Sequence, residues 1–269
     1  MISWIGGKSQ ISKWIIPFIP KDIKKYIEPF GGAFWVYLKM DLDTYPNLNQ
    51  VVYNDFNDYL VNLFISSKDH NNFYEFASKY KSQDKEIFLA FQKSLFSEKK
   101  EYQMPNFENA VGFAYLATQV WSGINPSDGK YIDLKGKYKS KFDTFRDKLK
   151  NTKYTNSLER ITDFENLDFE ELINKYDSED SFFYIDAPYY STEHYYSNHD
   201  FNEEDHIRLS KCLKGIKGRF AMSYYHFDKL EEWFPKTKYK WESREFNKSA
   251  MASKGKSQTK GTELLIMNY

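Results

Sequence analysis

The sequence predicts an α/β domain with a parallel sheet, interrupted by an insertion. Runs of strand-forming residues alternate with amphipathic helical stretches over residues 1–65 and again over residues 156–269. The intervening residues 66–155 are rich in Lys and Tyr and only weakly periodic. A chain of 269 residues has room for one large domain or for one domain that carries such an insertion.

Two strand–helix pairs are predicted before the insertion. A loop and a short helix over Lys8–Ile19 lead to a strand at Lys25–Glu28, which a proline and a glycine pair end. A helix is expected over residues 32–40, a second strand over 51–53 and a second helix over 58–65. This alternation is typical of a parallel sheet.

The same alternation returns in the last third of the chain. Helices are predicted over residues 168–175 and 203–213, and strands over 182–185, 219–223 and 263–268. Within the insertion, helices are predicted over residues 71–81 and 109–119, and residues 123–129 are predicted to be loop or turn.

Composition limits the setting and the chemistry. The net charge is zero, from 38 basic and 38 acidic residues, so bulk charge does not indicate a nucleic-acid partner. Cys212 is the only cysteine, which excludes an intrachain disulfide and fits a reducing cytoplasm. Neither a membrane span nor a secretory signal is predicted. The five histidines lack metal-ligand spacing, so no metal is expected.

Positive charge is nevertheless concentrated in two stretches. Residues 127–160 contain ten Lys or Arg against five Asp or Glu, and residues 236–260 contain eight against two. Such patches suit contact with phosphates, although solvated loops explain them equally well.

The most informative segment is Phe182–Tyr190. A run of strand formers ends in Asp186, Ala187, Pro188 and Tyr189, which places a carboxylate, backbone carbonyls and an aromatic face at the end of a buried strand. A planar amine such as that of adenine matches these groups. Asp186 can accept one N–H, a backbone carbonyl can accept the other, and Tyr189 can stack on the ring. A buried strand followed by a proline turn is the simpler alternative.

A second group of residues predicts a ligand site at neighbouring strand ends. Gly31 and Gly32 allow close backbone approach after the first strand, while Glu28 disfavours a pyrophosphate. Asp55 follows the next strand, where an acid commonly binds ribose hydroxyls. The pocket therefore favours an adenosine-like ligand with a positive end, such as S-adenosylmethionine. A turn or helix N-cap is the alternative role for Asp55.

Two further segments are weaker. Asp168 could accept from the cofactor's adenine amine, could cap the following helix, or could do both. The glycine pair before Lys8 again permits close backbone approach, but it forms no complete phosphate-binding loop. His206 and Arg208 are assigned no role, and His206 is expected to be a packing or surface histidine.

Five segments stand in an order that resembles the Dam-type DNA adenine-N6 methyltransferases of the D12 class, the alpha group. They are Trp4–Lys8, Glu28–Gly32, Asn54–Asp55, Asp168–Phe169 and Asp186–Tyr189. The ending Thr262–Tyr269 is also similar to the family's closing strand. The resemblance covers nearly the whole chain outside the insertion.

This resemblance implies a Rossmann-like, S-adenosylmethionine-dependent methyltransferase sheet formed by residues 1–65 and 156–269. Residues 66–155 are then a mainly helical target-recognition insertion, and the substrate is double-stranded DNA. The implied catalytic residues are Asp186, Ala187, Pro188 and Tyr189. The implied cofactor-binding residues are Trp4, Lys8, Glu28, Phe30, Gly31, Gly32, Asp55, Asp168 and Phe169. The lysines expected to hold DNA are Lys130, Lys135, Lys137, Lys139 and Lys141.

Two departures from the family pattern leave alternatives open. Ala187 stands where the family has proline, which keeps the carbonyl acceptor but frees φ and adds an N–H. The insertion lacks the phrases associated with members that read GATC, so the target sequence is open. Methylation of cytosine N4, RNA or a protein glutamine, and a catalytically weak DNA-binding relative, are the alternative functions.

Overall fold

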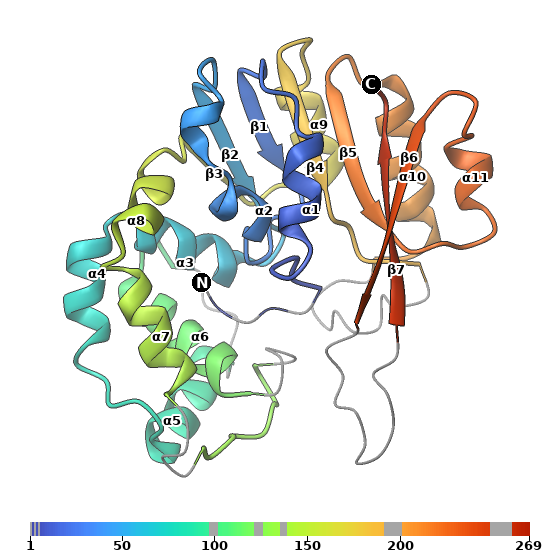
Figure 1. Cartoon of the computed structure of the whole chain (residues 1–269). Coiled ribbons are helices and arrows are strands. Elements are labelled where there is room, and N and C mark those ends of the chain that lie inside the picture. Colours follow the sequence, from blue (N-terminus) through green and yellow to red (C-terminus); the bar gives the residue numbers. More distant parts are fainter. Residues whose placement is uncertain are drawn as a thin grey trace.

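The computed structural model contains one seven-stranded mixed sheet covered by helices (Figure 1). It describes residues 2, 4, 6–96, 102–120, 126–134, 139–190, 201–247 and 260–269. The strand order is β3-β2-β1-β4-β5-β7-β6. The predicted α/β class with a Rossmann-like sheet is confirmed.

Five neighbouring strands run parallel, and the last two form an antiparallel edge. The parallel strands are β1 (Lys25–Glu28), β2 (Gln50–Asn54), β3 (Asp163–Glu165), β4 (Ser181–Ile185) and β5 (Arg219–Tyr224). The antiparallel strands are β6 (Lys240–Asn247) and β7 (Lys260–Met267). Strand β4 is buried along its whole length, as expected for a central parallel strand with helices on both faces.

The direction of winding reverses between β1 and β4. From β1 the chain proceeds to β2 and β3 on one side, and from β4 to β5 on the other. Open α/β sheets bind ligands at the carboxyl ends of their strands beside such a switch point. The topology therefore marks the ends of β1 and β4 as the place for a site.

Helices cover both faces of this sheet. One face carries α1 (Ser12–Ile15), α2 (Trp35–Lys39), α3 (Asp58–Lys68) and α8 (Thr152–Glu159), with two short 3-10 turns at Ile16–Phe18 and Leu42–Thr44. The other face carries α9 (Phe169–Tyr176), α10 (Glu203–Gly215) and α11 (Leu230–Trp233). Alternate strand residues supply the two cores: Tyr26 and Phe182 face the first, whereas Ile27 and Phe183 face the second.

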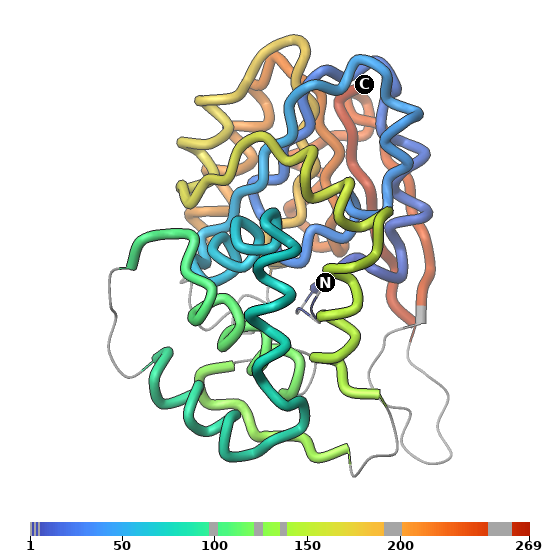
Figure 2. The backbone as a smooth tube through the Cα atoms, turned by 90° about the vertical axis from the view of Figure 1, so that its left-hand side faces the viewer, coloured from blue at the N-terminus to red at the C-terminus, as the bar shows by residue number. Residues whose placement is uncertain are grey.

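Between α3 and α8 the described residues form helices and loops and contain no strand. The helices are α4 (His70–Ala77), α5 (Lys85–Phe96), α6 (Phe107–Gln119) and α7 (Lys141–Lys148). They gather below the sheet in Figure 2. Their buried apolar side chains belong to the same core cluster as those on the first face of the sheet. Helix α6 is buried from Ala110 to Gln119, so it is the centre of this layer. The bounds 66–155 for a separate recognition domain stay a prediction.

The elements differ from the expected ones in ways that have local causes. The helix expected at residue 32 begins at Trp35, because Gly32 and Phe34 have φ of 49° and 56° and cannot belong to a right-handed helix. Strand β3 has three half-buried residues, too few for a periodic signal. Strand β6 is an edge strand rich in charged residues, and α5 was not predicted within the Lys-rich stretch.

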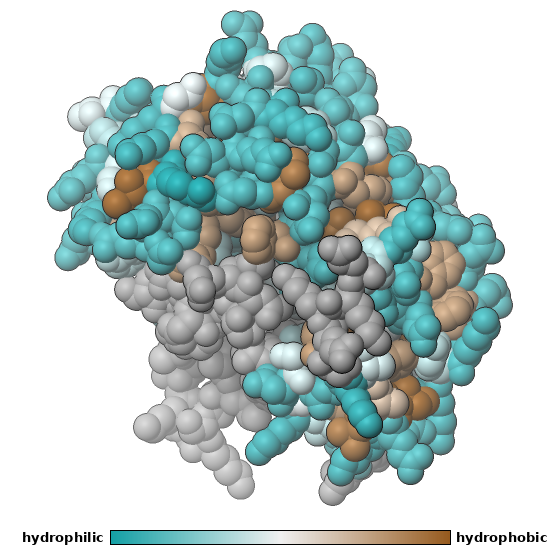
Figure 3. Space-filling model, turned by 180° about the vertical axis from the view of Figure 1, so that it is seen from behind, coloured by the Kyte–Doolittle hydropathy of each residue, from teal (hydrophilic) through white to brown (hydrophobic). Residues whose placement is uncertain are grey.

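On the side seen in Figure 3, the described surface is mainly hydrophilic, with scattered apolar side chains. The large exposed apolar residues of the described chain are Phe56, Leu89 and Tyr269, which lie far apart in the sequence. Single exposed apolar residues of this kind need no partner to explain them.

Candidate active site

The carboxyl ends of β1 and β4 bring two acids to the switch point of the sheet. Glu28 is the last residue of β1 and Asp186 directly follows β4. The strands pair in parallel with Ile27 opposite Phe183, so both acids leave the sheet at the same edge. Residues that are 158 positions apart in sequence therefore share one site, as the strand-end argument predicted.

Asp186 is held by an ion pair with Lys8. The Nζ atom of Lys8 lies 2.8 Å from Oδ1 of Asp186, and the two side chains are 8% and 19% exposed. Burial raises the pKa of the Asp186 carboxyl, and the neighbouring Lys8 ammonium opposes that shift. Because the ion pair favours the charged form, Lys8 helps to keep this acid available as a hydrogen-bond acceptor.

Lys8 reaches the site from a tight loop before α1. Its ammonium also donates to the carbonyl of Gly6, at 3.0 Å, and lies 4.7 Å from the centroid of the Tyr189 ring. A Cβ atom at Gly7 would lie 3.0 Å from the Trp4 carbonyl oxygen and 3.2 Å from the Trp35 ring. The glycine thus permits the close packing that aims Lys8 inward, as its motif suggested.

Tyr189 is buried, and its hydroxyl is directed at two carboxylates. It donates to Glu263 and lies 3.3 Å from Oδ1 of Asp186. Its ring packs against Tyr224 and Tyr225, with centroids 5.0 and 4.5 Å away. The predicted stacking of a nucleobase on this ring stays a prediction, and in this structure the Lys8 ammonium lies over the ring.

Glu263 is a site residue that the sequence analysis did not single out. It is 1% exposed and comes from β7, where it precedes the buried run Leu264–Met267. Its Oε1 atom lies 3.5 Å from Nζ of Lys8 and accepts from the Tyr189 hydroxyl. An acid directly before an uninterrupted apolar strand was the available signal, but its neighbours are set by the pairing of β7 with β5.

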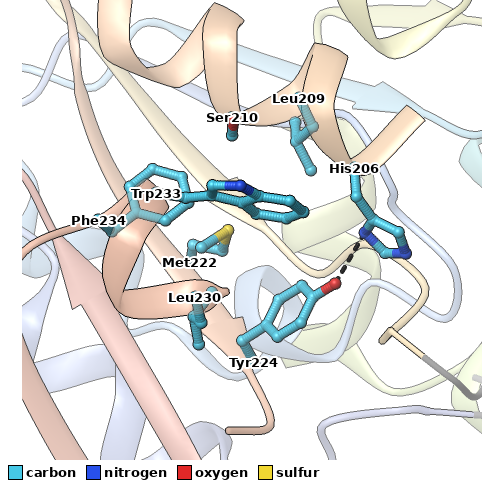
Figure 4. A pocket seen from close by; sticks show the side chains of 8 residues that line it. All are labelled: His206, Leu209, Ser210, Met222, Tyr224, Leu230, Trp233 and Phe234. Atoms are coloured by element: carbon cyan, nitrogen blue, oxygen red, sulfur yellow. Dashed lines mark hydrogen bonds between the residues drawn. The ribbon is translucent and has the colours of Figure 1, made fainter. Parts of the chain in front are cut away.

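Residues of β5 and α10, on the face of the sheet covered by α9, α10 and α11, anchor the rest of the Asp186–Tyr190 segment. Ala187 and Pro188 are buried. The backbone N–H of Tyr190 donates to the Tyr224 hydroxyl at 3.1 Å, and that hydroxyl lies 2.8 Å from Nδ1 of His206. Figure 4 shows His206 and Tyr224 at the edge of a small, mostly apolar cavity between α10 and α11. The expectation that His206 is a packing residue is confirmed.

Glu28 is almost fully buried beneath the site. It is 2% exposed and accepts from the Tyr26 hydroxyl at 2.6 Å. Burial raises the pKa of Glu28 well above its usual value, and the Asp186 carboxylate adds to that shift. A positively charged group bound beside Glu28 would draw the carboxyl back to its ionised form.

The glycine pair after β1 forms a tight cradle against the end of β2. A Cβ atom at Gly31 would lie 2.4 Å from the Tyr53 ring, so only glycine fits there. The N–H of Gly31 donates to the Asn54 carbonyl at 2.7 Å, and the N–H of Gly32 donates to Asp55 at 2.8 Å. The side-chain amide of Asn54 also donates to the carbonyl of Pro29 and to a loop carbonyl after β3, which locks three strand ends together.

Asp55 is therefore a turn residue with both carboxylate oxygens engaged. Besides Gly32, it accepts from the N–H of Asn57, and Asn57 is the N-cap of α3. The alternative turn role is confirmed, while ribose binding stays a prediction. Burial raises the pKa of Asp55 to about 6, although the two backbone hydrogen bonds act to lower it.

Asp168 and Phe169 lie next to Phe30 at the start of α9. Asp168 is the N-cap of this helix, so the alternative capping role is confirmed, and it also pairs with Arg208 at 2.8 Å. The rings of Phe30 and Phe169 stack with centroids 5.5 Å apart, and the Arg208 guanidinium covers Phe169. Arg208, which had no assigned role, thus supports this wall. Binding of the cofactor's adenine amine by Asp168 stays a prediction.

Trp4 joins the site to the helical layer. Its ring lies 5.7 Å from that of Phe113 on α6, and a Cβ atom at Gly32 would lie 3.2 Å from it. The Trp4 ring therefore lies between Gly32 and the helical layer of the insertion. Its neighbours Ser3 and Ile5 lie outside the described residues.

The predicted DNA-binding lysines are only partly covered by the structure. Lys130, Lys139 and Lys141 are exposed, and Lys139 pairs with Asp147. Lys135 and Lys137 lie outside the described residues, as do residues 123–125 of the predicted loop and residues 248–259 of the second basic stretch. The phosphate contacts stay a prediction.

Neither a metal-binding cluster nor a membrane-spanning helix is found among the described residues. Among them, no group of three or more His, Cys, Asp or Glu side chains is placed to hold a metal ion. None of the described helices has the length and apolar character needed to cross a membrane.

Comparison with known proteins identifies the family. A family model for D12 class N6 adenine-specific DNA methyltransferases matches residues 4–248. The type II methyltransferase M.MjaIII of Methanocaldococcus jannaschii is 30% identical over 100% of this chain and 98% of its own length. M1.LlaDCHI of Lactococcus lactis is 26% identical over 99% and 94%, and M.CviBI of a Paramecium bursaria Chlorella virus is 23% identical over 100% and 99%. The chain therefore belongs to the D12 class of N6 adenine-specific DNA methyltransferases and is a site-specific DNA methyltransferase.

Proposed function

We propose that this enzyme transfers a methyl group from S-adenosylmethionine to N6 of an adenine that it extrudes from double-stranded DNA. The observation that carries the proposal is the position of Asp186 and the Ala187 carbonyl at the switch point of the sheet, beside the Glu28–Gly32 cradle. An adenine inside a duplex is out of reach of a strand end, so the base must leave the stack.

The residues present fit S-adenosylmethionine. Gly31 and Gly32 let the backbone after β1 pack closely against the end of β2 and against Trp4. Phe30 and Phe169 offer flat apolar faces, and buried Glu28 suits a cationic end. S-adenosylmethionine contains no pyrophosphate, so the Glu28 carboxylate does not repel it as it would a dinucleotide. When bound, S-adenosylmethionine supplies a methyl group activated by a sulfonium. Glu28, Phe30 and Phe169 would hold and orient it, and we assign its ribose to Asp55 and its adenine amine to Asp168, beside the turn and capping bonds that these two acids make.

Asp186 and the carbonyl of Ala187 act on the target amine. The lone pair of the adenine amine is delocalised into the ring, so the nitrogen is a poor nucleophile. Two acceptors for its hydrogens favour tetrahedral geometry and free the lone pair for attack. Positioning and electrostatic stabilisation supply most of the acceleration, and no covalent enzyme intermediate is needed.

Lys8 has to give way for this to happen. Its ammonium lies 2.8 Å from the Asp186 oxygen and over the Tyr189 ring, where the amine and the base are expected to bind. Entry of the target base thus exchanges one hydrogen-bond donor for another at Asp186. The buried carboxylate keeps a partner in both states, which limits the cost of opening the site.

The relatives are named as type II methyltransferases, and we propose the same modification role for this chain at a DNA sequence of its own. The test is transfer of labelled methyl from S-adenosylmethionine into duplexes that differ only in the presence of adenine. Label in N6-methyladenine of the first duplex supports the proposal. Label in cytosine, in RNA or in protein alone would reject it.

A further inference from the structure

Glu263 is a buried acid in contact with two residues of the active site. It belongs to β7, beyond residues 4–248 that the family model covers. It accepts from the Tyr189 hydroxyl and lies 3.5 Å from the Lys8 ammonium. An acid that is 1% exposed is costly to keep unless its charge is compensated, so its position requires an explanation.

We propose that Glu263 is a positioning residue for methyl transfer, which holds the Tyr189 hydroxyl and retains the Lys8 ammonium when Asp186 turns to the target amine. The inference rests on the proposed function and deepens it. It gives β7, the last strand in the chain, a part in the active site. None of the five segments that carry the family resemblance includes Glu263.

The Lys8 ammonium has two carboxylate partners within reach, Asp186 and Glu263. Nζ of Lys8 is 2.8 Å from Asp186 and 3.5 Å from Glu263, so a small rotation of a flexible lysine moves it from the first carboxylate to the second. Glu263 is the second carboxylate beside Lys8 among the described residues, so a Lys8 that leaves Asp186 can remain paired through it in a buried site. With Glu263, the ammonium stays paired while Asp186 accepts the amine.

The same acid fixes the aromatic ring. Tyr189 donates its hydroxyl to Glu263 across 74 residues of sequence, while Tyr225 meets the ring edge-on. A ring that is held at its hydroxyl and packed against Tyr225 keeps its orientation when Lys8 moves off its face. Such pre-organisation reduces the cost of stacking a base there.

The two carboxylates share Lys8 and Tyr189 as partners, and both partners affect their titration. Burial raises the pKa of Glu263, Lys8 opposes that shift, and the Asp186 carboxylate adds to it. Among the described residues, the other titratable groups that face Glu263 are Tyr184, Tyr189 and Tyr225, and Arg244 is its partner in the β6 register. Without the Glu263 charge, the Lys8 ammonium and the Tyr189 hydroxyl lose their second carboxylate and are left to Asp186, whose pKa both of them lower.

The experiment compares Glu263→Gln with the wild-type enzyme in single-turnover methylation of duplex DNA across a range of pH. We expect a rate lower by about ten-fold or more, since Lys8 now competes more strongly with the target amine. We also expect the acid limb of the profile to move to lower pH, and dissociation constants for DNA and S-adenosylmethionine to stay within about three-fold. Glu263→Asp, which keeps the charge, is expected to recover part of the rate.

Glu245→Gln is the matched control, because Glu245 lies on the paired strand β6 with an exposed side chain. It should leave the rate and the pH profile unchanged. A wild-type rate in Glu263→Gln, or a lower rate with an unmoved acid limb and a lowered melting temperature, would overturn the inference. Absence of methyl transfer by the wild-type enzyme would instead reject the proposed function.

Discussion

The strand-end site and the basic stretch of the insertion use charge in opposite ways. At the strand ends, Lys8 and Glu263 are buried, Asp186 is mostly buried, and the Lys8 ammonium lies within ion-pair distance of both acids. In the insertion, Lys130 and Lys141 are exposed, and the pair of Lys139 with Asp147 is open to solvent. Charges in the first group are fixed by packing and are weakly screened, whereas the second group acts through a field that salt weakens.

Because of this difference, a single substitution is expected to have a large effect in the buried cluster and a small one among the exposed lysines. Removing one member of a buried cluster leaves its partners uncompensated and changes their pKa values. Removing one exposed lysine subtracts one of several similar contributions to phosphate binding. The following substitutions test that contrast, beginning with the largest expected effect.

Asp186→Ala should abolish methyl transfer, with a loss of about 10²–10³-fold or more, because the target amine loses a charged acceptor. Binding of S-adenosylmethionine should persist, since Asp186 is assigned to the base. Methylation kinetics and calorimetry measure the two effects. Asp180→Ala is the control, as Asp180 is an exposed ion-pair partner of Lys24 just before the opposite end of β4. Joint loss of methylation and cofactor binding would contradict the assignment.

Lys8→Met should move the acid limb of the rate profile to higher pH. Lys8 opposes the rise in the pKa of Asp186, so without it the carboxyl becomes protonated at a higher pH and ceases to accept from the amine. The pH dependence of the single-turnover rate measures this shift, which is opposite in sign to that of Glu263→Gln. Lys24→Met, at an exposed lysine, provides the comparison. An unshifted limb would remove Lys8 from the titration of Asp186.

Asp55→Asn should weaken S-adenosylmethionine binding at neutral pH by about ten-fold, the value of a hydrogen bond to a charged acceptor. The pKa of Asp55 is raised to about 6, so in the wild-type protein this contribution is present above pH 6 and is lost as the pH falls through that value. Binding measured at pH 5 and pH 8 should differ less in the variant. Asp43→Asn, at an exposed acid, should behave as wild type. Equal affinities would exclude Asp55 from the cofactor site.

Lys130→Gln combined with Lys141→Gln should lower DNA affinity modestly and reduce the slope of log affinity against log salt by about one per lysine. Cofactor affinity should not change. The matched control is Lys211→Gln with Lys214→Gln, at exposed lysines of α10. DNA binding titrations over a range of salt concentrations provide the measurement. A slope equal to that of the control would show that these lysines do not contact phosphates.

The site residues that were predicted correctly are those whose position depends on their neighbours in the sequence. Asp186 and Glu28 are followed by proline within one or two residues and end predicted strands, so local residue types placed them at one edge of a parallel sheet. The capping of α9 by Asp168 and the turn at Asp55 were foreseen as alternatives for the same reason. Strand β6 lacked such a signal, because its pairing with β7 determines it.

Neighbouring residues were enough to place the carboxyl ends of β1, β2 and β4, since strand length and turn chemistry depend on local sequence. The position of Lys8 between Asp186 and Glu263, and the bond from Tyr189 to Glu263, follow instead from the folding of the whole sheet. Those contacts join the first loop, a central strand and the last strand. No local pattern encodes them, because the sheet order brings these segments together.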